Sequence, residues 1–330
     1  MRNVFAVMAL AAVCMFSMGW LSAADGPPGW AYGFPPGPSA PAAAPVPAPA
    51  AAPDTSLKHL PGSSGAFTVP QIRDAFGPAD WYPGDHPPMP DVVSHGHRPD
   101  VRACGLCHYP NGKGRPENAG VAGLPNSYFI QTMMDFRNGG RKSSEPRKAN
   151  TNVMIAIAKG MTEAEIKEAA EYYGSMKWTP WIKVIETKMV TKTRIAGGMF
   201  LTEEGGEKEP LGARIIETPE NTEGTELLRD ARSGFFAYVP VGSIKKGEAL
   251  VTTGGGKTTT CAVCHGADLK GMGPVPGLAG RSPSYMVRQM FDMQQGARKG
   301  QWTELMKPVV SKLSEDDMLA IAAYLASRMP

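Results

Sequence analysis

The 330-residue sequence has little excess charge of either sign and very few cysteines. Its 34 Lys and Arg against 31 Asp and Glu leave a net charge of +3, too small to favour nucleic acid or an anionic membrane as a partner. Of the five Cys, four stand in two short motifs and the fifth, Cys14, lies in an N-terminal apolar run. No further Cys is therefore available near either motif for a four-ligand zinc site.

Two motifs of the same form hold those four cysteines. Residues 104–108 read Cys-Gly-Leu-Cys-His and residues 261–265 read Cys-Ala-Val-Cys-His. Residues three apart share one face of a helical turn, so both sulfurs can bond the two vinyl groups of one porphyrin. The histidine that follows then lies under the iron as an axial ligand. The motifs predict two covalently bound haem c groups, attached through Cys104 and Cys107 with His108, and through Cys261 and Cys264 with His265.

A redox disulfide is the competing interpretation of each Cys pair. A thioredoxin-like site requires a strand, a turn and a helix around the pair, whereas the flanks here are rich in Pro and Gly. Attachment of two haems would also leave the mature chain without a free thiol, which suits an oxidising compartment.

The N-terminus predicts export. Residues 1–24 contain Arg2, an apolar run and a small-residue end, Ser-Ala-Ala, which is typical of a signal peptide cleaved after Ala24. The run is long enough that an uncleaved membrane anchor is the alternative. Residues 25–60 are largely Pro, Ala and Gly and predict a disordered spacer. The expected location is periplasmic, with membrane contact only through the N-terminal segment.

An internal repeat organises the rest of the chain. The two motifs are offset by 157 residues, and the same offset aligns Tyr128 with Tyr285 and Arg141 with Arg298. Five extra residues near 143–148 then reduce the offset to 152. We expect two homologous domains, at 80–178 and 242–330, joined by a connector at 179–241.

Each copy has the pattern of a helical domain. Thr162 and Ser314 are each followed three residues later by an acid, as at a helix start, and apolar residues then recur at helical spacing. A second amphipathic helix is expected at 127–138 and at 284–295. The connector contains three short β-prone runs. Its basic and acidic runs are either solvated faces or a docking surface for a redox partner.

The second copy resembles class I cytochrome c domains, and the whole chain resembles the periplasmic two-domain, c4-like and c553-like group. The resemblance rests on residues 261–268, 276–280, 284–285 and 296–298, and on Met306 followed by an acidic helix start. It implies a mainly α fold of two cytochrome c-type helical domains joined by an irregular connector with a few short β-strands. It also implies that Met306 is the distal iron ligand and that Pro276 offers its carbonyl to the proximal His.

The distal ligand of the first haem is open between two kinds of residue. Met154 aligns with Met306 at the 152 offset and is the expected ligand. However, Ala119 stands where the second copy has Pro276, and the lead-in to the first motif contains His86, His95 and His97. His95 or His97 would give a bis-His haem of lower reduction potential.

The function expected from these features is single-electron transfer between protein redox partners, such as a dehydrogenase, an oxidase or a reductase. Two filled axial positions leave no open site for a substrate, so the chain is expected to be a carrier with no catalytic residues. The alternatives are a haem enzyme such as a dihaem peroxidase with an open first haem, and a cytochrome subunit of a periplasmic dehydrogenase complex.

Overall fold

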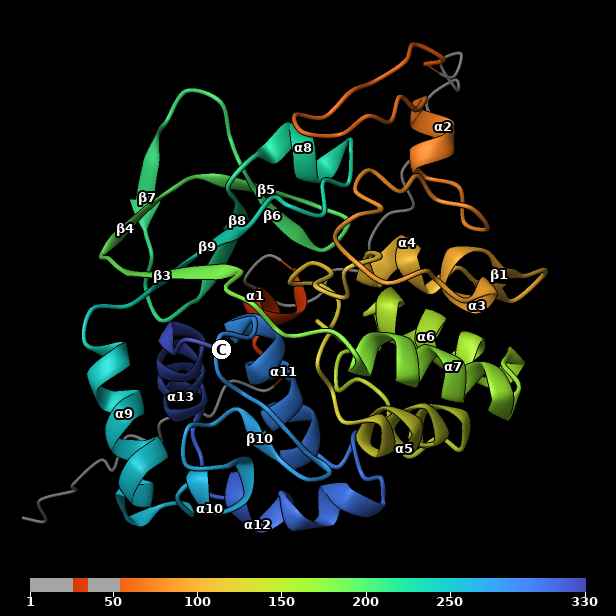
Figure 1. Ribbon diagram of the computed structural model, residues 1–330. Coiled ribbons are helices and arrows are strands. Elements are labelled where there is room, and N and C mark those ends of the chain that lie inside the picture. Colours follow the sequence, from red (N-terminus) through yellow and green to blue (C-terminus); the bar gives the residue numbers. More distant parts are fainter. Residues whose placement is uncertain (1–25, 35–53) are drawn as a thin grey trace, which may run out of the picture.

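The computed structural model describes residues 26–34 and 54–330, so the predicted signal peptide lies outside it. Two groups of helices lie side by side beneath a region of short strands (Figure 1). Helices of the first copy are at the right of that view, and helices of the second copy are at the bottom. None of the helices in the described ranges is long and apolar enough to cross a bilayer.

The first helical group surrounds the first motif. It is preceded by α2 and by the β1–β2 pair, and its core contains Val93, Ile166 and Tyr173, each almost fully buried. The elements are α2 (Val69–Ile72), α3 (Asp91–Ser94), β1 (Gly96–His97), β2 (Val101–Arg102), α4 (Cys104–His108), α5 (Asn126–Arg137), α6 (Ala149–Gly160) and α7 (Glu163–Gly174).

The second helical group repeats this arrangement with a longer lead-in helix. Its core is built on α13, which packs against α9 and α11. The elements are α9 (Ser243–Thr253), η1 (Gly254–Gly256), α10 (Ala262–His265), β10 (Gly271–Met272), β11 (Val275–Pro276), α11 (Pro283–Gln294), η2 (Gln301–Leu305), α12 (Lys307–Val310) and α13 (Glu315–Ser327).

The predicted helix starts are confirmed. The Thr162 hydroxyl accepts from the Glu165 amide at 3.2 Å, and the Glu165 carboxylate accepts from the Thr162 amide at 2.7 Å. Ser314 and Asp317 form the same reciprocal pair at the start of α13. Each pair satisfies amides that have no partner within the helix. The two middle helices also form where their amphipathic patterns predicted them, as α5 and α11.

The connector contains more regular structure than the few strands expected from its sequence. In its main sheet, β3 pairs in parallel with β9, and β9 pairs antiparallel with β8. The pairs β4–β7 and β5–β6 are both antiparallel. Its elements are β3 (Ile182–Glu186), β4 (Met189–Thr191), β5 (Thr193–Ala196), β6 (Met199–Thr202), β7 (Lys208–Pro210), β8 (Ile216–Pro219), α8 (Thr222–Glu226) and β9 (Phe235–Val239).

This strand region shares a hydrophobic core with the second helical group. Ile215, Ile216 and Val239 are fully buried in the same cluster as Ala322 of α13. The connector is therefore packed on the second copy as part of one folded body. Short runs of β-branched and aromatic residues predicted strands here, but their burial depends on partners far away in the sequence.

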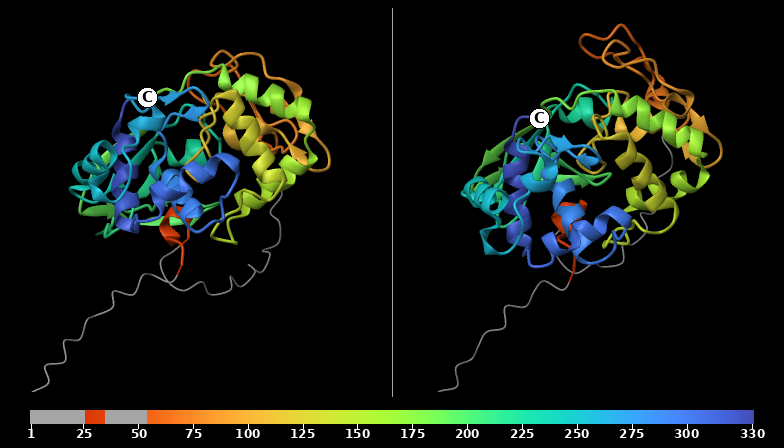
Figure 2. Two further views of the ribbon diagram at one scale, coloured as in Figure 1. Left: turned by 90° about the horizontal axis from the view of Figure 1, so that it is seen from below. Right: turned by 60° about the horizontal axis from the view of Figure 1, so that its bottom comes forward.

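The predicted disordered spacer at 25–60 is wrong for the residues that are described within it. Residues Gly29–Tyr32 form a short helix, α1, in which Ala31 and Tyr32 are each only 1% exposed. Figure 2 shows this segment, in red, lying against the blue helices of the second copy. Residues 54–60 are also ordered, and Leu60 is buried. The prediction for 35–53 lies outside the described residues.

The two copies meet along a strip that has approximate two-fold symmetry. The Lys142 amide donates to the Ala297 carbonyl at 2.8 Å, and the Lys299 amide donates to the Gly140 carbonyl at 2.7 Å. These four residues are equivalent pairs at the 157 offset. The same backbone surface of each copy therefore faces its own counterpart, as in a symmetric dimer interface.

Candidate haem sites

A cavity of about 270 Å³ lies beside the first motif. Cys104, Cys107 and His108 line one side of it, and Met154 from α6 also lines it. Much of the remaining wall is apolar or aromatic, contributed by Val121, Leu124, Phe129, Met133, Phe136, Val153, Ile157, Met161 and Tyr173. The structure thus brings both predicted cysteines, the predicted proximal His and the predicted distal Met of the first site to one apolar space.

Both motif histidines are oriented by a backbone carbonyl. Nδ1 of His265 lies 2.8 Å from the Pro276 carbonyl oxygen, and Nδ1 of His108 lies 2.8 Å from the Ala119 carbonyl oxygen. A carbonyl only accepts, so Nδ1 carries the proton and the Nε2 lone pair is left for a metal. Replacing Pro by Ala in the first copy therefore leaves this contact intact, because the backbone supplies the acceptor.

Burial sets the ionisation of the motif side chains in the polypeptide. It lowers the pKa of both His108 and His265, which favours the neutral imidazole that binds a metal. It raises the pKa of the Cys104 thiol to about 12 and that of Cys261 to about 11. Catalytic redox thiols have lowered pKa values, so these two thiols lack the character of a thioredoxin-like pair.

The second motif lies closer to the surface than the first. Cys264 is exposed and Val263 is 63% exposed, whereas His265 is buried. Met306 stands at the junction of η2 and α12 and packs against the second core together with Cys261. Of the predicted residues of this site, Cys261 and Met306 thus pack against the same core.

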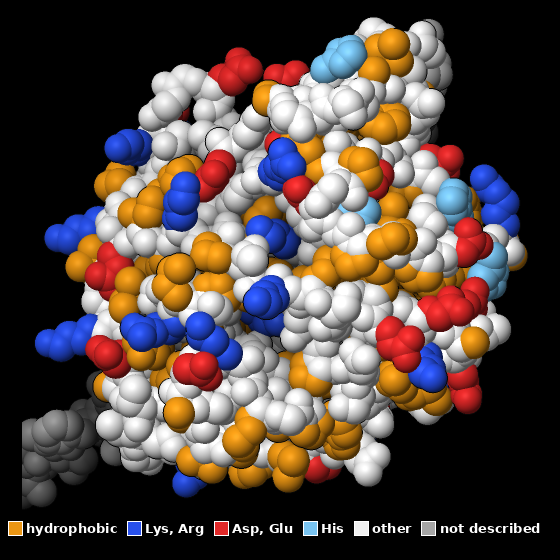
Figure 3. All heavy atoms as spheres, viewed as in Figure 1, with side chains coloured by type: hydrophobic (Ala, Val, Ile, Leu, Met, Phe, Trp, Pro, Cys, Tyr) orange, Lys and Arg blue, Asp and Glu red, His pale blue; other side chains and the backbone are white. Residues whose placement is uncertain are grey.

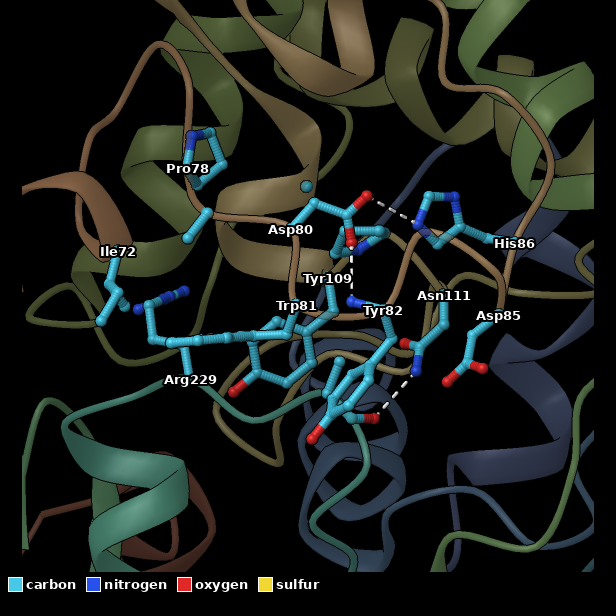
Figure 4. A pocket seen from close by; sticks show the side chains of 14 residues that line it. Ile72, Pro78, Asp80, Trp81, Tyr82, Asp85, His86, Tyr109, Asn111 and Arg229 are labelled. Carbon is cyan, nitrogen blue, oxygen red and sulfur yellow. Dashed lines mark hydrogen bonds and ion pairs between the residues drawn. The ribbon is translucent and has the colours of Figure 1, made fainter. Parts of the chain in front are cut away.

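The three lead-in histidines lie outside the first cavity and have other partners. His95 pairs with Asp91 at 3.0 Å and His97 with Glu165 at 3.2 Å, both on the surface. His86 lines a different, much smaller pocket, where its Nε2 lies 3.1 Å from Asp80 (Figure 4). None of the three is among the residues that line the 270 Å³ cavity.

Sequence reasoning missed the polar end of the first cavity. Arg141, Lys148 and Arg288 line it together with Tyr285, so both copies contribute to one site. Only Arg141 carried a sequence signal, since it aligns with Arg298 in the repeat. Lys148 lies at the end of the five-residue insertion, and Arg288 is on α11 of the other copy, so no local pattern connects them to the first motif.

The first cavity fits a haem on its own chemistry. The group needs an apolar cleft for its ring, an imidazole with a free Nε2, and cations for its carboxylates. The cavity supplies all three. By contrast, no cluster of three or more His, Cys, Asp or Glu suited to a metal ion occurs in the two described ranges.

On the face seen in Figure 3, acidic and basic side chains are interspersed, in keeping with the small net charge.

Comparisons with known proteins identify the family of the chain. The family model described as cytochrome c matches residues 244–328. Cytochrome c-554(548) of Halomonas halodenitrificans is 40% identical over 73 residues, which are 22% of this chain and 88% of that protein. The thiosulfate dehydrogenase electron acceptor of Thiomonas intermedia is 24% identical over 237 residues, covering 70% of this chain and 80% of that protein.

Cytochrome c4 of Azotobacter vinelandii is 22% identical over 228 residues, covering 67% of this chain and 82% of that protein. Alignments of this length extend beyond the 89 residues of the second copy, so they include the first. The chain therefore belongs to the cytochrome c family, as a c4-like cytochrome that binds haem c covalently and transfers electrons.

Proposed function

We propose that this chain is a periplasmic carrier with two haem c groups, each held by one motif and ligated by His and Met. His108 and Met154 would ligate the first iron, and His265 and Met306 the second. The observation that carries this proposal is the single apolar cavity lined by Cys104, Cys107, His108 and Met154. Because neither His95 nor His97 lines this cavity, we favour Met154 as the distal ligand of the first iron.

When bound, each haem supplies an iron that gains or loses one electron. The residues of the chain hold and tune that group. The carbonyls of Ala119 and Pro276 fix the two imidazoles at 2.8 Å, so no ring rotation is needed when the charge on the iron changes. A Met sulfur opposite the imidazole favours a higher reduction potential than a second imidazole would. The apolar side chains that line the first cavity would limit the access of water to a haem bound there.

The dihaem peroxidase alternative requires an open distal position with acid and base groups beside it. Met154 lines the cavity where such a position would be, and the histidines of the lead-in have partners elsewhere. We therefore favour a carrier with both axial positions filled.

The proposed partner is a periplasmic dehydrogenase that passes electrons to this chain. The relative named as an electron acceptor of thiosulfate dehydrogenase supports this class of partner. Residues 1–24 would direct export, and any membrane contact would come from that segment alone. The division into domains at 80–178 and 242–330, with a connector at 179–241, is part of the same proposal.

A redox titration followed in the visible and near-infrared tests the proposal. The ferric protein should show two Met–Fe charge-transfer signals, one for each haem, and both should disappear on reduction. A single signal would leave the first iron with a ligand other than Met154. Reaction of the ferric protein with peroxide at a catalytic rate would instead favour the enzyme alternative.

A further inference from the structure

Within the part of the chain that the structure describes, three buried cations at the polar end of the first cavity have only neutral hydrogen-bond partners. Arg141, Lys148 and Arg288 are 7%, 4% and 5% exposed. Arg141 donates to the Tyr285 hydroxyl and the Gln289 amide oxygen; Lys148 donates to the Tyr32 carbonyl; and Arg288 donates to the carbonyls of Ala31 and Pro116. Among the described residues, none of the three forms an ion pair with a carboxylate within 4.0 Å.

Two buried carboxylates line the same cavity, and each has partners of its own. Glu117 pairs with Arg115 at 2.6 Å. Asp292 accepts from the Tyr32 hydroxyl and the Ser144 amide, both at 2.7 Å. Glu217, which is buried near Arg288 but does not line the cavity, is a third carboxylate. With Glu117 paired to Arg115, the three cations still outnumber the two remaining buried carboxylates, Asp292 and Glu217. Burial of unpaired charge is costly, and here burial lowers the pKa of Lys148 to about 7, with the nearby Arg288 charge contributing.

We propose that Arg141, Lys148 and Arg288 bind the two propionate carboxylates of the first haem, and that Lys148 and Arg288 raise its reduction potential. This inference rests on the proposed function, since it assumes a haem in the first cavity. The propionates would give these cations the anionic partners that the chain itself does not place within ion-pair distance. Arg288 belongs to the second copy, so the second domain would complete the binding site of the first haem.

The repeat conserves only one of these three cations. At the 157 offset, Arg141 of the first copy is equivalent to Arg298 of the second, and Asp292 of the second copy is equivalent to Asp135 of the first. Arg288 of the second copy, however, is equivalent to an uncharged residue of the first, Gln131. At the 152 offset, Gly300 stands in place of Lys148. The Gln131 amide instead donates to Asp135 at 2.8 Å. Two of the three buried cations are therefore specific to the first site.

The expected consequence is electrostatic. Reduction lowers the positive charge on the iron, so a buried cation nearby favours the reduced form and raises the potential. The effect is stronger for a buried charge than for an exposed one, which water and salt screen. Removing Lys148 or Arg288 should therefore lower the potential of the first haem and leave the second nearly unchanged.

The test is spectroelectrochemical titration of the full-length holoprotein carrying Arg288→Gln or Lys148→Met. Arg288→Gln introduces the residue that the repeat has at the equivalent position. Met154→His, measured separately, identifies the wave of the first haem, because a second imidazole lowers its potential. Haem content by pyridine haemochrome is measured for every variant.

We expect each variant to lower the midpoint of the first wave only. Lys167→Met is the matched control, because it removes an exposed cation on α7 that does not line the cavity and should move neither midpoint. Arg288→Lys keeps the positive charge, so the midpoint potential of its first haem should stay close to that of the wild type. This holds even if the loss of the hydrogen bonds to the Ala31 and Pro116 carbonyls lowers the stability of the protein. If both haems are bound and neither midpoint moves in Arg288→Gln and Lys148→Met, the inference is wrong while the proposed function stands. If only one haem is bound by the wild-type chain, the proposed function itself fails.

Discussion

Arg141 and Arg298 face each other across the two copies, and each guanidinium reaches a tyrosine of the opposite copy. Their backbones form an antiparallel bridge. Arg141 donates to the Tyr285 hydroxyl at 3.0 Å, and Arg298 donates to the Tyr128 hydroxyl at 2.8 Å. The arginines, like the tyrosines, are equivalent in the repeat. The internal duplication has therefore produced a reciprocal contact between its two products.

This reciprocal contact should stabilise the pairing of the two copies. Tyr128→Phe and Tyr285→Phe each remove one acceptor from a buried arginine, at a cost of about 1–3 kcal/mol in unfolding free energy. Chemical unfolding of the holoprotein measures this cost. Tyr238→Phe is the control, since Tyr238 is partly buried like the other two but, among the described residues, its hydroxyl accepts no hydrogen bond from an arginine. Equal stability of all three variants would show that the two Arg–Tyr hydrogen bonds between the copies contribute nothing to the free energy of unfolding.

The distal ligands give a prediction specific to each haem. Met154→Ala should abolish one Met–Fe charge-transfer signal, and Met306→Ala should abolish the other, because each removes the sulfur from one iron. The matched control is Met133→Leu, which changes a methionine that also lines the first cavity but lies on α5. Loss of a signal in Met133→Leu, with both signals retained in Met154→Ala, would overturn the ligand assignment.

The N-terminal helix α1 should be part of the folded body. Its Tyr32 hydroxyl donates to the buried Asp292 carboxylate at 2.7 Å. Hydrogen bonds to charged groups contribute about 1.5–3 kcal/mol, so Tyr32→Phe should lower the unfolding free energy by that order. Trp30→Ala should cost about 3–5 kcal/mol, since Trp30 is only 9% exposed. Leu57→Ala provides the control, because Leu57 is 60% exposed; a loss equal to that of Trp30→Ala would contradict the account.

Acid should weaken the second domain through Asp317, which lies in the first turn of α13 and caps the helix together with Ser314. Burial alone would raise the pKa of Asp317, but hydrogen bonds from Lys246 and Lys257 outweigh it and hold that pKa well below its usual value. The unfolded chain then takes up a proton near pH 4 while the folded chain stays ionised. The stabilisation is therefore present above about pH 4 and is lost as the pH falls below it.

Urea unfolding at several pH values measures this effect. Asp317→Asn should cost about 1–3 kcal/mol at pH 7, because it removes the buried carboxylate that accepts from two half-exposed lysines. The difference from wild type should shrink below about pH 4, where the wild-type carboxylate loses its advantage. The control is Asp316→Asn, which changes the exposed neighbour that also pairs with Lys246. A cost for Asp317→Asn that did not change with pH would show that its ionisation is not involved.

Local patterns in the sequence predicted the parts of the fold that depend on near neighbours. Thr162 with Glu165 and Ser314 with Asp317 mark helix starts whose partners are three residues apart. The motif residues were predicted from their spacing, Met306 from the resemblance to class I cytochrome c domains, and Met154 from its alignment with Met306. Their roles as iron ligands stay predictions. The change from Pro276 to Ala119 seemed a departure at the sequence level, yet a backbone carbonyl does not depend on its side chain.

Features that depend on distant partners could not be predicted in this way. Residues 29–32 lie in a segment rich in Pro and Gly, and their order comes from Lys148, Arg288 and Asp292, more than 100 positions later. The composition therefore indicated disorder where tertiary contacts impose a helix. The shared charged end of the first cavity was missed for the same reason.

The intact mass of the exported, matured protein tests the central claim most directly. Wild type should carry the mass of two haems, and the double substitutions Cys104→Ala/Cys107→Ala and Cys261→Ala/Cys264→Ala should each carry one. The pyridine haemochrome spectrum should fall to half in both variants. A wild-type mass without two haem additions, or two haems retained after either double substitution, would contradict the account.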